Sequence, residues 1–193
     1  MKSNESTDDT AIDDVIRSRA RRLGLAGLLA AAMTATAAHA AAPPTAPPAE
    51  VAQLLNQMAG RWSARGIGVT VQGKAAKSDS DVTCEKTTGG WALRCRVEVN
   101  TGGHRQELLQ ILGWDRSSGE FHLFSVSDAG DSHDHHGSLD GKTLNLEYRG
   151  TRDGKAFVEQ LAFAIKGPKE LLWKDTCTLG GEVVFSGEGI YHK

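Results

Sequence analysis

The chain has 193 residues, 39% of them hydrophobic and 24% charged, and a formal net charge of −2. This length allows one domain together with a short additional segment. The near-neutral charge gives no reason to expect a nucleic-acid partner, because such partners select strongly basic surfaces. The 22 glycines are typical of a turn-rich globular protein.

Residues 1–40 have the pattern of an export signal peptide. Arginines between Arg17 and Arg22 precede an apolar run from Leu23 to Ala38, and the tripeptide Ala-His-Ala ending at Ala40 matches a cleavage pattern. We place cleavage after Ala40, so the protein is expected to be periplasmic or secreted. The apolar run is short for a membrane span and no comparable run follows, so no span is expected in the mature chain. An uncleaved anchor is the alternative.

The segment Arg21-Arg22-Leu23-Gly24-Leu25 also resembles a twin-arginine signal, which would export the protein already folded. Ala20 stands where such signals usually carry Ser or Thr, so the general secretory route is favoured. The route bears on cofactors, because folded export is the one expected when a cofactor is inserted before translocation.

Residues 41–48 read AAPPTAPP, a Pro-Ala linker expected to be extended. Beyond it, Val51, Leu54, Leu55 and Met58 recur at helical spacing, which predicts a single amphipathic helix from about Ala49 to Met58. Its apolar face is expected to close one end of the fold that follows. A helix that binds a partner is the alternative.

After Arg61 the hydrophobic period changes to two, which indicates half-buried strands. Trp91, Leu93, Cys95, Val97 and Val99 share one face, and turn signals such as Gly89-Gly90 and Asp140-Gly141 recur at short intervals. Tight turns with no crossover helix favour an up-and-down antiparallel β-barrel of about ten strands, all-β and lipocalin-like, spanning 49–193. The further strands are expected at residues 65–72, 104–114, 120–127, 133–139, 143–149, 156–166, 171–179 and 182–192.

The three cysteines are an odd number, so one thiol stays unpaired within the chain. A hairpin turning at Gly89-Gly90 places Cys84 directly opposite Cys95, within disulfide reach. We predict a structural disulfide there and a buried free thiol at Cys177, with two free thiols in the hairpin as the alternative.

Several short motifs together resemble a lipocalin-like family of bacterial barrels of unknown function, which is similar to nitrobindin-type calycin barrels. The resemblance covers roughly Val51 to Lys193 and implies ligand binding inside a barrel. The motifs are Gly60-Arg61-Trp62, Gly113-Trp114-Asp115 before Ser118-Gly119, Phe124-Ser125-Val126-Ser127-Asp128 and Gly137-Ser138-Leu139-Asp140-Gly141.

Nitrobindins bind haem through a histidine on a C-terminal strand. The positional match in this chain is His192, although the sequence from Gly189 to Lys193 does not reproduce the local motif of that family. The resemblance therefore offers His192 as a haem ligand, against the alternative of a terminal residue without a ligand role.

A polar cluster lies between residues 131 and 136. His133 and His135 share one face of the expected strand and, with Asp131, are candidate ligands of a transition metal. His136 points the other way, so a further ligand would have to come from elsewhere, such as His122 or Asp128. The alternative is a solvated strand and turn.

Glu159 shares its expected face with apolar residues of the same strand, among them Phe157 and Leu161. If that face is the barrel interior, Glu159 would orient a ligand or act as an acid or base. A structural ion pair is the alternative. Trp62, Trp91 and Trp114 are candidate ligand-binding residues, against the alternative that the chain's four tryptophans belong to the core.

The chain has no nucleophile elbow, phosphate loop or dinucleotide fingerprint, which favours a binding protein over an enzyme of those classes. Our first hypothesis is an exported barrel that binds a small apolar ligand and needs no cofactor. The second is a haem- or metal-binding redox protein or enzyme that uses His133 and His135 or His192. The third is a structural or interaction protein whose barrel is filled by its own side chains.

Overall fold

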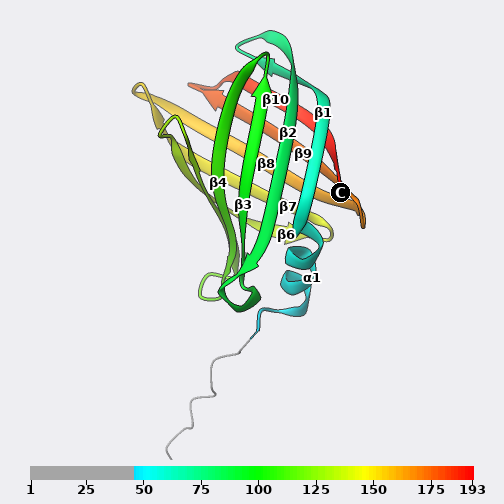
Figure 1. The fold of residues 1–193 in the computed structure, drawn as a ribbon. Coiled ribbons are helices and arrows are strands. Elements are labelled where there is room, and N and C mark those ends of the chain that lie inside the picture. Colours follow the sequence, from blue (N-terminus) through cyan, green and yellow to red (C-terminus); the bar gives the residue numbers. More distant parts are fainter. Residues whose placement is uncertain (1–45) are drawn as a thin grey trace, which may run out of the picture. The chain divides into compact units, whose positions relative to one another are not determined.

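A computed structural model describes residues 46–193 of the chain. The predicted export signal lies outside the described residues. A short helix is followed by ten strands (Figure 1). The elements are α1 (Ala49–Met58), β1 (Gly60–Val71), β2 (Lys74–Thr87), a 3-10 turn η1 (Thr88–Gly90), β3 (Ala92–Thr101), β4 (His104–Asp115), β5 (Glu120–Ser127), β6 (Ser132–Asp140), β7 (Thr143–Arg152), β8 (Lys155–Gly167), β9 (Glu170–Leu179) and β10 (Glu182–His192).

Each strand pairs antiparallel with its neighbours in sequence, and β10 pairs with β1 to close the barrel. The predicted up-and-down barrel of ten strands with one short N-terminal helix is therefore confirmed. β1 begins at Gly60, five residues before the expected start at Arg65, because Trp62 and Ala64 already point into the core and pair with β2. The structure thus extends the alternating pattern back to the helix.

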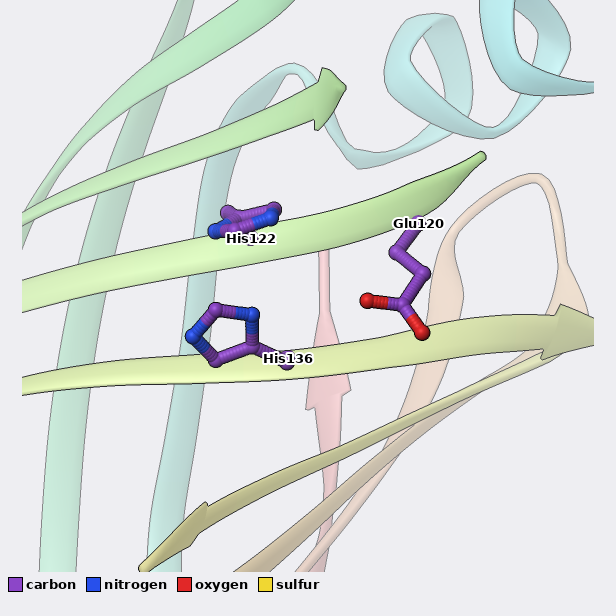
Figure 2. A group of neighbouring side chains, drawn as sticks. All are labelled: Glu120, His122 and His136. Atoms are coloured by element: carbon purple, nitrogen blue, oxygen red, sulfur yellow. The ribbon is translucent and has the colours of Figure 1, made fainter. Parts of the chain in front are cut away.

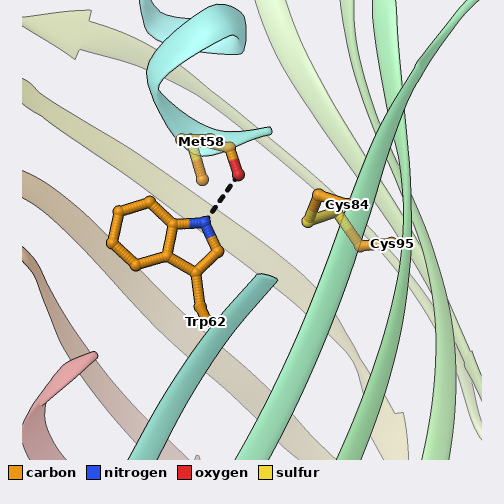
Figure 3. Close-up of a disulfide and its surroundings, with 4 residues drawn as sticks. All are labelled: Met58, Trp62, Cys84 and Cys95. Carbon is orange, nitrogen blue, oxygen red and sulfur yellow. Dashed lines mark hydrogen bonds between the residues drawn. A yellow bond between two sulfur atoms is a disulfide. The ribbon is translucent and has the colours of Figure 1, made fainter. Parts of the chain in front are cut away.

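The helix α1 spans the predicted residues, and its apolar face is buried in the core cluster through Val51, Leu54, Leu55 and Met58. The indole of Trp62 donates a hydrogen bond to the Met58 carbonyl over 2.8 Å, which ties the end of the helix to β1 (Figure 3). The helix therefore lies at one end of the barrel, as expected. It is too short and too polar to cross a membrane, and no other helix of residues 46–193 meets that requirement either.

Because consecutive strands run antiparallel, successive turns lie at alternate ends of the barrel. The turns after β2, β4, β6 and β8 lie at the end that carries α1, and those after β1, β3, β5, β7 and β9 lie at the opposite end (Figure 1). Polar turn residues at that second end, such as Gln72 and Asp153, adopt positive φ angles. We call this second end the open end.

Cys84 and Cys95 pair across β2 and β3 and form a disulfide, as predicted (Figure 3). The turn between these strands has four residues rather than two, because Thr88, Gly89 and Gly90 all adopt positive φ. The longer turn is centred on Gly89-Gly90, as the predicted turn is, so Cys84 still lies opposite Cys95. Cys177 is a buried free thiol, which also agrees with the prediction.

Candidate functional site

The barrel encloses a cavity of about 590 Å³. It extends from the helix end, where Met58 and Trp62 line it, to the open end, where Gln72 and Asp153 line it. The volume lies within the range of about 300–1,000 Å³ that is usual for small-molecule sites. Much of the wall is apolar, with contributions from Ile67, Val82, Leu112, Leu123, Leu161, Phe163, Leu171 and Trp173.

One part of the wall carries ionisable side chains. His133 and His135 come from β6, Glu159 from β8, and Asp175 and Cys177 from β9. Side chains alternate between the two faces of a strand, so positions 133 and 135 point inward together, as do positions 175 and 177. We call these five residues the inner cluster.

Glu159 lies at the centre of the inner cluster. Its Oε2 atom is 2.6 Å from His133 Nδ1 and 3.2 Å from His135 Nε2. Burial alone would raise the pKa of this carboxyl, but the hydrogen bond from His133 and the two adjacent imidazoles outweigh it and lower the pKa to about 2. Glu159 is therefore ionised at neutral pH and accepts a hydrogen bond from His133 Nδ1–H.

His135 is 1% exposed, which makes it one of the most deeply buried side chains. Its Nδ1–H donates to the Leu123 carbonyl over 3.2 Å, because a carbonyl can only accept. The Nε2 atom lies close to Glu159, yet it has no hydrogen bond of acceptable geometry among residues 46–193. This nitrogen is therefore a buried polar atom without a hydrogen bond among the described residues.

Aromatic rings fix the orientation of His133. The Tyr148 ring stacks on it with a centroid distance of 4.2 Å and an interplanar angle of 9°. A Cβ atom at Gly150 would clash with the end of the Tyr148 side chain, so the glycine leaves room for the ring in this position. Phe157 lies 5.4 Å from the imidazole on another side. The imidazole is therefore held in a preorganised position.

Asp175 and Cys177 complete the inner cluster. Burial raises the pKa of the Asp175 carboxyl to about 8, and the negative charge of Glu159 adds to the shift. Burial also raises the pKa of the Cys177 thiol, whose sulfur lies 3.7 Å from Asp175 Oδ1. At pH 7 both groups are protonated, so Glu159 is the one anionic group of the inner cluster.

A second group of histidines lies on the outer face of β5 and β6. Figure 2 shows Glu120, His122 and His136, whose ligand atoms lie within 4.8 Å of one another. The two imidazoles contact each other edge to face, and both lie near Asp134. All these side chains are partly or fully exposed, so their polar atoms are accessible to water. We call this set the outer group.

The structure places the remaining predicted ligands away from the inner cluster. Asp131 lines the open end, 3.8 Å from Arg152, and its side chain is exposed. The third residue beside His133 and His135 is Glu159 rather than Asp131, His122 or Asp128. His192 is 63% exposed, faces Glu170 and does not line the cavity among the described residues.

Of the three tryptophans predicted to bind a ligand, one lines the cavity and two do not. Trp62 lines the cavity, whereas Trp91 lies half-buried in the turn before β3. Trp114 packs edge to face on Phe121, 4.9 Å away, and neither Trp91 nor Trp114 is among the described residues that line the cavity. Trp173 on β9 also lines the cavity.

The structure is a closed antiparallel β-barrel with an internal cavity. No family model matches the sequence, and no curated protein matches it either. Among solved structures, the chain is similar to the S-type phycobiliprotein lyase CPES from Guillardia theta, with 11% sequence identity and a TM-score of 0.47. The match covers 74% of this chain and 92% of that chain. The resemblance to nitrobindin-type barrels stays a prediction.

Proposed function

We propose that this protein binds a small, largely apolar molecule with one polar end in the barrel cavity. The observation that carries the proposal is the 590 Å³ cavity, whose apolar wall is interrupted at the inner cluster. Cavities of this kind, with few polar groups set in an apolar wall, are typical of small-molecule sites. The cavity also argues against the third hypothesis, a structural protein whose barrel is filled by its own side chains.

The two ends of the cavity suggest how such a molecule is oriented. Trp62 and Met58 form an apolar floor, so the apolar body of the ligand lies toward the helix. The ionised Glu159 and its two histidines lie on the side wall, where they bind the polar end. Polar residues such as Thr101 and Gln106 line the route from the open end.

A matched pair of variants tests binding inside the cavity. Leu108 lines the cavity, whereas its neighbour Leu109 is 47% exposed on the outer face. We expect the neutral probe N-phenyl-1-naphthylamine to bind the protein with an increase in its fluorescence. Leu108→Trp should weaken this binding at least about tenfold, because the indole occupies ligand volume, and Leu109→Trp should leave it unchanged. Equal affinities of the two variants, or no binding by the unaltered protein, would contradict the proposal.

We further propose that the protein is exported, with cleavage after Ala40. The Cys84–Cys95 disulfide supports this proposal, because disulfides persist mainly in oxidising compartments. Expressed with its full N-terminus in a bacterial host, the protein should appear in the periplasmic or secreted fraction with Ala41 as its first residue. N-terminal sequencing checks this expectation. An intact N-terminus in the cytoplasmic fraction would contradict it.

A further inference from the structure

We propose that His133, His135 and Glu159 bind one divalent transition-metal ion inside the barrel, through one nitrogen of each imidazole and the carboxylate. The ligand atoms of the three side chains lie within 4.8 Å of one another. Two imidazoles and one carboxylate are a donor set that zinc and iron(II) take in proteins, with positions left open for other ligands. The proposal does not depend on the identity of the apolar ligand.

The strongest support comes from the Nε2 atom of His135. Its partner nitrogen, Nδ1, donates a hydrogen to the Leu123 carbonyl, so in the neutral ring Nε2 carries a lone pair. That lone pair lies 3.2 Å from the Glu159 carboxylate, which also only accepts. Two acceptor atoms at this distance repel each other unless a proton or a metal ion lies between them, and the geometry here does not suit a hydrogen bond from Nε2 to the carboxylate. A metal ion bound to both atoms satisfies both acceptors.

The surroundings of the three side chains are those of preorganised ligands. The hydrogen bond from His135 Nδ1 to a backbone carbonyl is the contact by which metal-binding histidines are commonly oriented. Stacking on Tyr148 fixes the ring of His133. When a metal ion binds Nδ1 of a neutral His133 ring, the proton that Nδ1 donates to Glu159 moves to Nε2 of the same ring. No side chain needs to cross the cavity for the site to form.

The outer group, on β5 and β6, provides a contrast. Glu120, His122 and His136 have a similar donor set, but their side chains are accessible to water. None of the three has a buried nitrogen without a hydrogen bond. Removing His122 and His136 therefore serves as a matched control, because it deletes two histidines from β5 and β6 without touching the cavity.

The test uses Co²⁺ and Zn²⁺ as probes on the full chain, first stripped with a chelator. The unaltered protein should bind one equivalent of Co²⁺ tightly, with visible d–d absorption that Zn²⁺ abolishes. Glu159→Gln keeps the shape of the side chain, and we expect it to weaken the affinity for Zn²⁺ at least about 100-fold. His122→Ala/His136→Ala should bind Zn²⁺ as tightly as the unaltered protein at this site.

Circular dichroism establishes that each variant is folded. If Glu159→Gln does not fold, His133→Gln takes its place in the test. The His133 side chain is slightly less buried than that of Glu159, and its replacement also removes one of the three ligands. If the folded inner-cluster variant binds Zn²⁺ as tightly as the unaltered protein, the proposal is overturned. It is also overturned if only the His122→Ala/His136→Ala variant loses the tight Zn²⁺ site. Absence of tight binding in the unaltered protein also overturns it. Binding of N-phenyl-1-naphthylamine is measured in the presence of chelator. Absence of probe binding would therefore contradict the proposed apolar-ligand function without bearing on the metal site.

Discussion

Replacement of Asp175 by Asn is expected to raise the free energy of unfolding by about 4 kcal/mol at pH 7 and to leave it nearly unchanged at pH 4. The reason is that burial, together with the charge of Glu159, raises the pKa of Asp175 to about 8 in the folded protein. The carboxyl of a solvated Asp has a pKa of 3.8. Urea unfolding in the presence of chelator, at both pH values, measures the difference.

The sign follows from proton uptake. Between pH 4 and pH 8 the unfolded chain has lost the Asp175 proton while the folded chain keeps it, so stability falls as pH rises through this window. Asn cannot ionise and removes that dependence. The groups facing Asp175 are Glu159 on β8, Tyr191 on β10 and Cys177 on its own strand, and all three remain in the variant.

Glu182→Gln is the control for this prediction, because Glu182 is exposed at the start of β10. It should change the free energy of unfolding by less than about 0.5 kcal/mol at either pH. An equal effect of Asp175→Asn at pH 4 and pH 7 would show that Asp175 is ionised in the folded protein, against the prediction.

Replacing Cys84 and Cys95 together by Ala is expected to lower the free energy of unfolding by about 3 kcal/mol. The disulfide closes a loop with a sequence separation of 11, and its loss restores conformational entropy to the unfolded chain. Both residues are also buried in the core cluster, so their removal leaves unfilled space beside the helix end. Denaturant unfolding under oxidising conditions measures the effect.

A reductant supplies the control. Dithiothreitol should lower the stability of the unaltered protein toward that of the double variant and should leave the double variant unchanged, because Cys177 has no disulfide partner within the described chain. If the two proteins are equally stable without reductant, the disulfide does not contribute to stability and this prediction is wrong.

The sequence predicts the architecture well because the relevant signals are local. Four apolar residues at helical spacing end before Gly60, and the structure has a helix over the same residues. Turn residues such as Asp140-Gly141 separate alternating strands, and the structure turns there. The disulfide follows from the centre of a single hairpin. Each of these features depends on residues that are close together in the chain.

The inner cluster is formed by residues that are far apart in the sequence, on β6, β8 and β9. The sequence predicts that His133 and His135 share one strand face and offers Glu159 as an inward-facing candidate on another strand, but β7 lies between β6 and β8. Their proximity depends on the register of two successive hairpins, and a shift by one residue would turn a side chain to the other face. Asp175 was missed, although its alternation with Leu171 and Trp173 on β9 was a usable signal.

The pairing of β1 with β10 has a consequence for folding kinetics. Ser63 lies opposite His192, so the contact that closes the barrel joins the first and the last strand of the chain. Such a contact carries a large loop-closure entropy, and proteins rich in non-local pairings fold slowly. Until that pairing forms, β1 and β10 are unpaired edges that can recruit strands from other molecules. The interval between translation and closure is therefore the period in which this protein is most prone to aggregate.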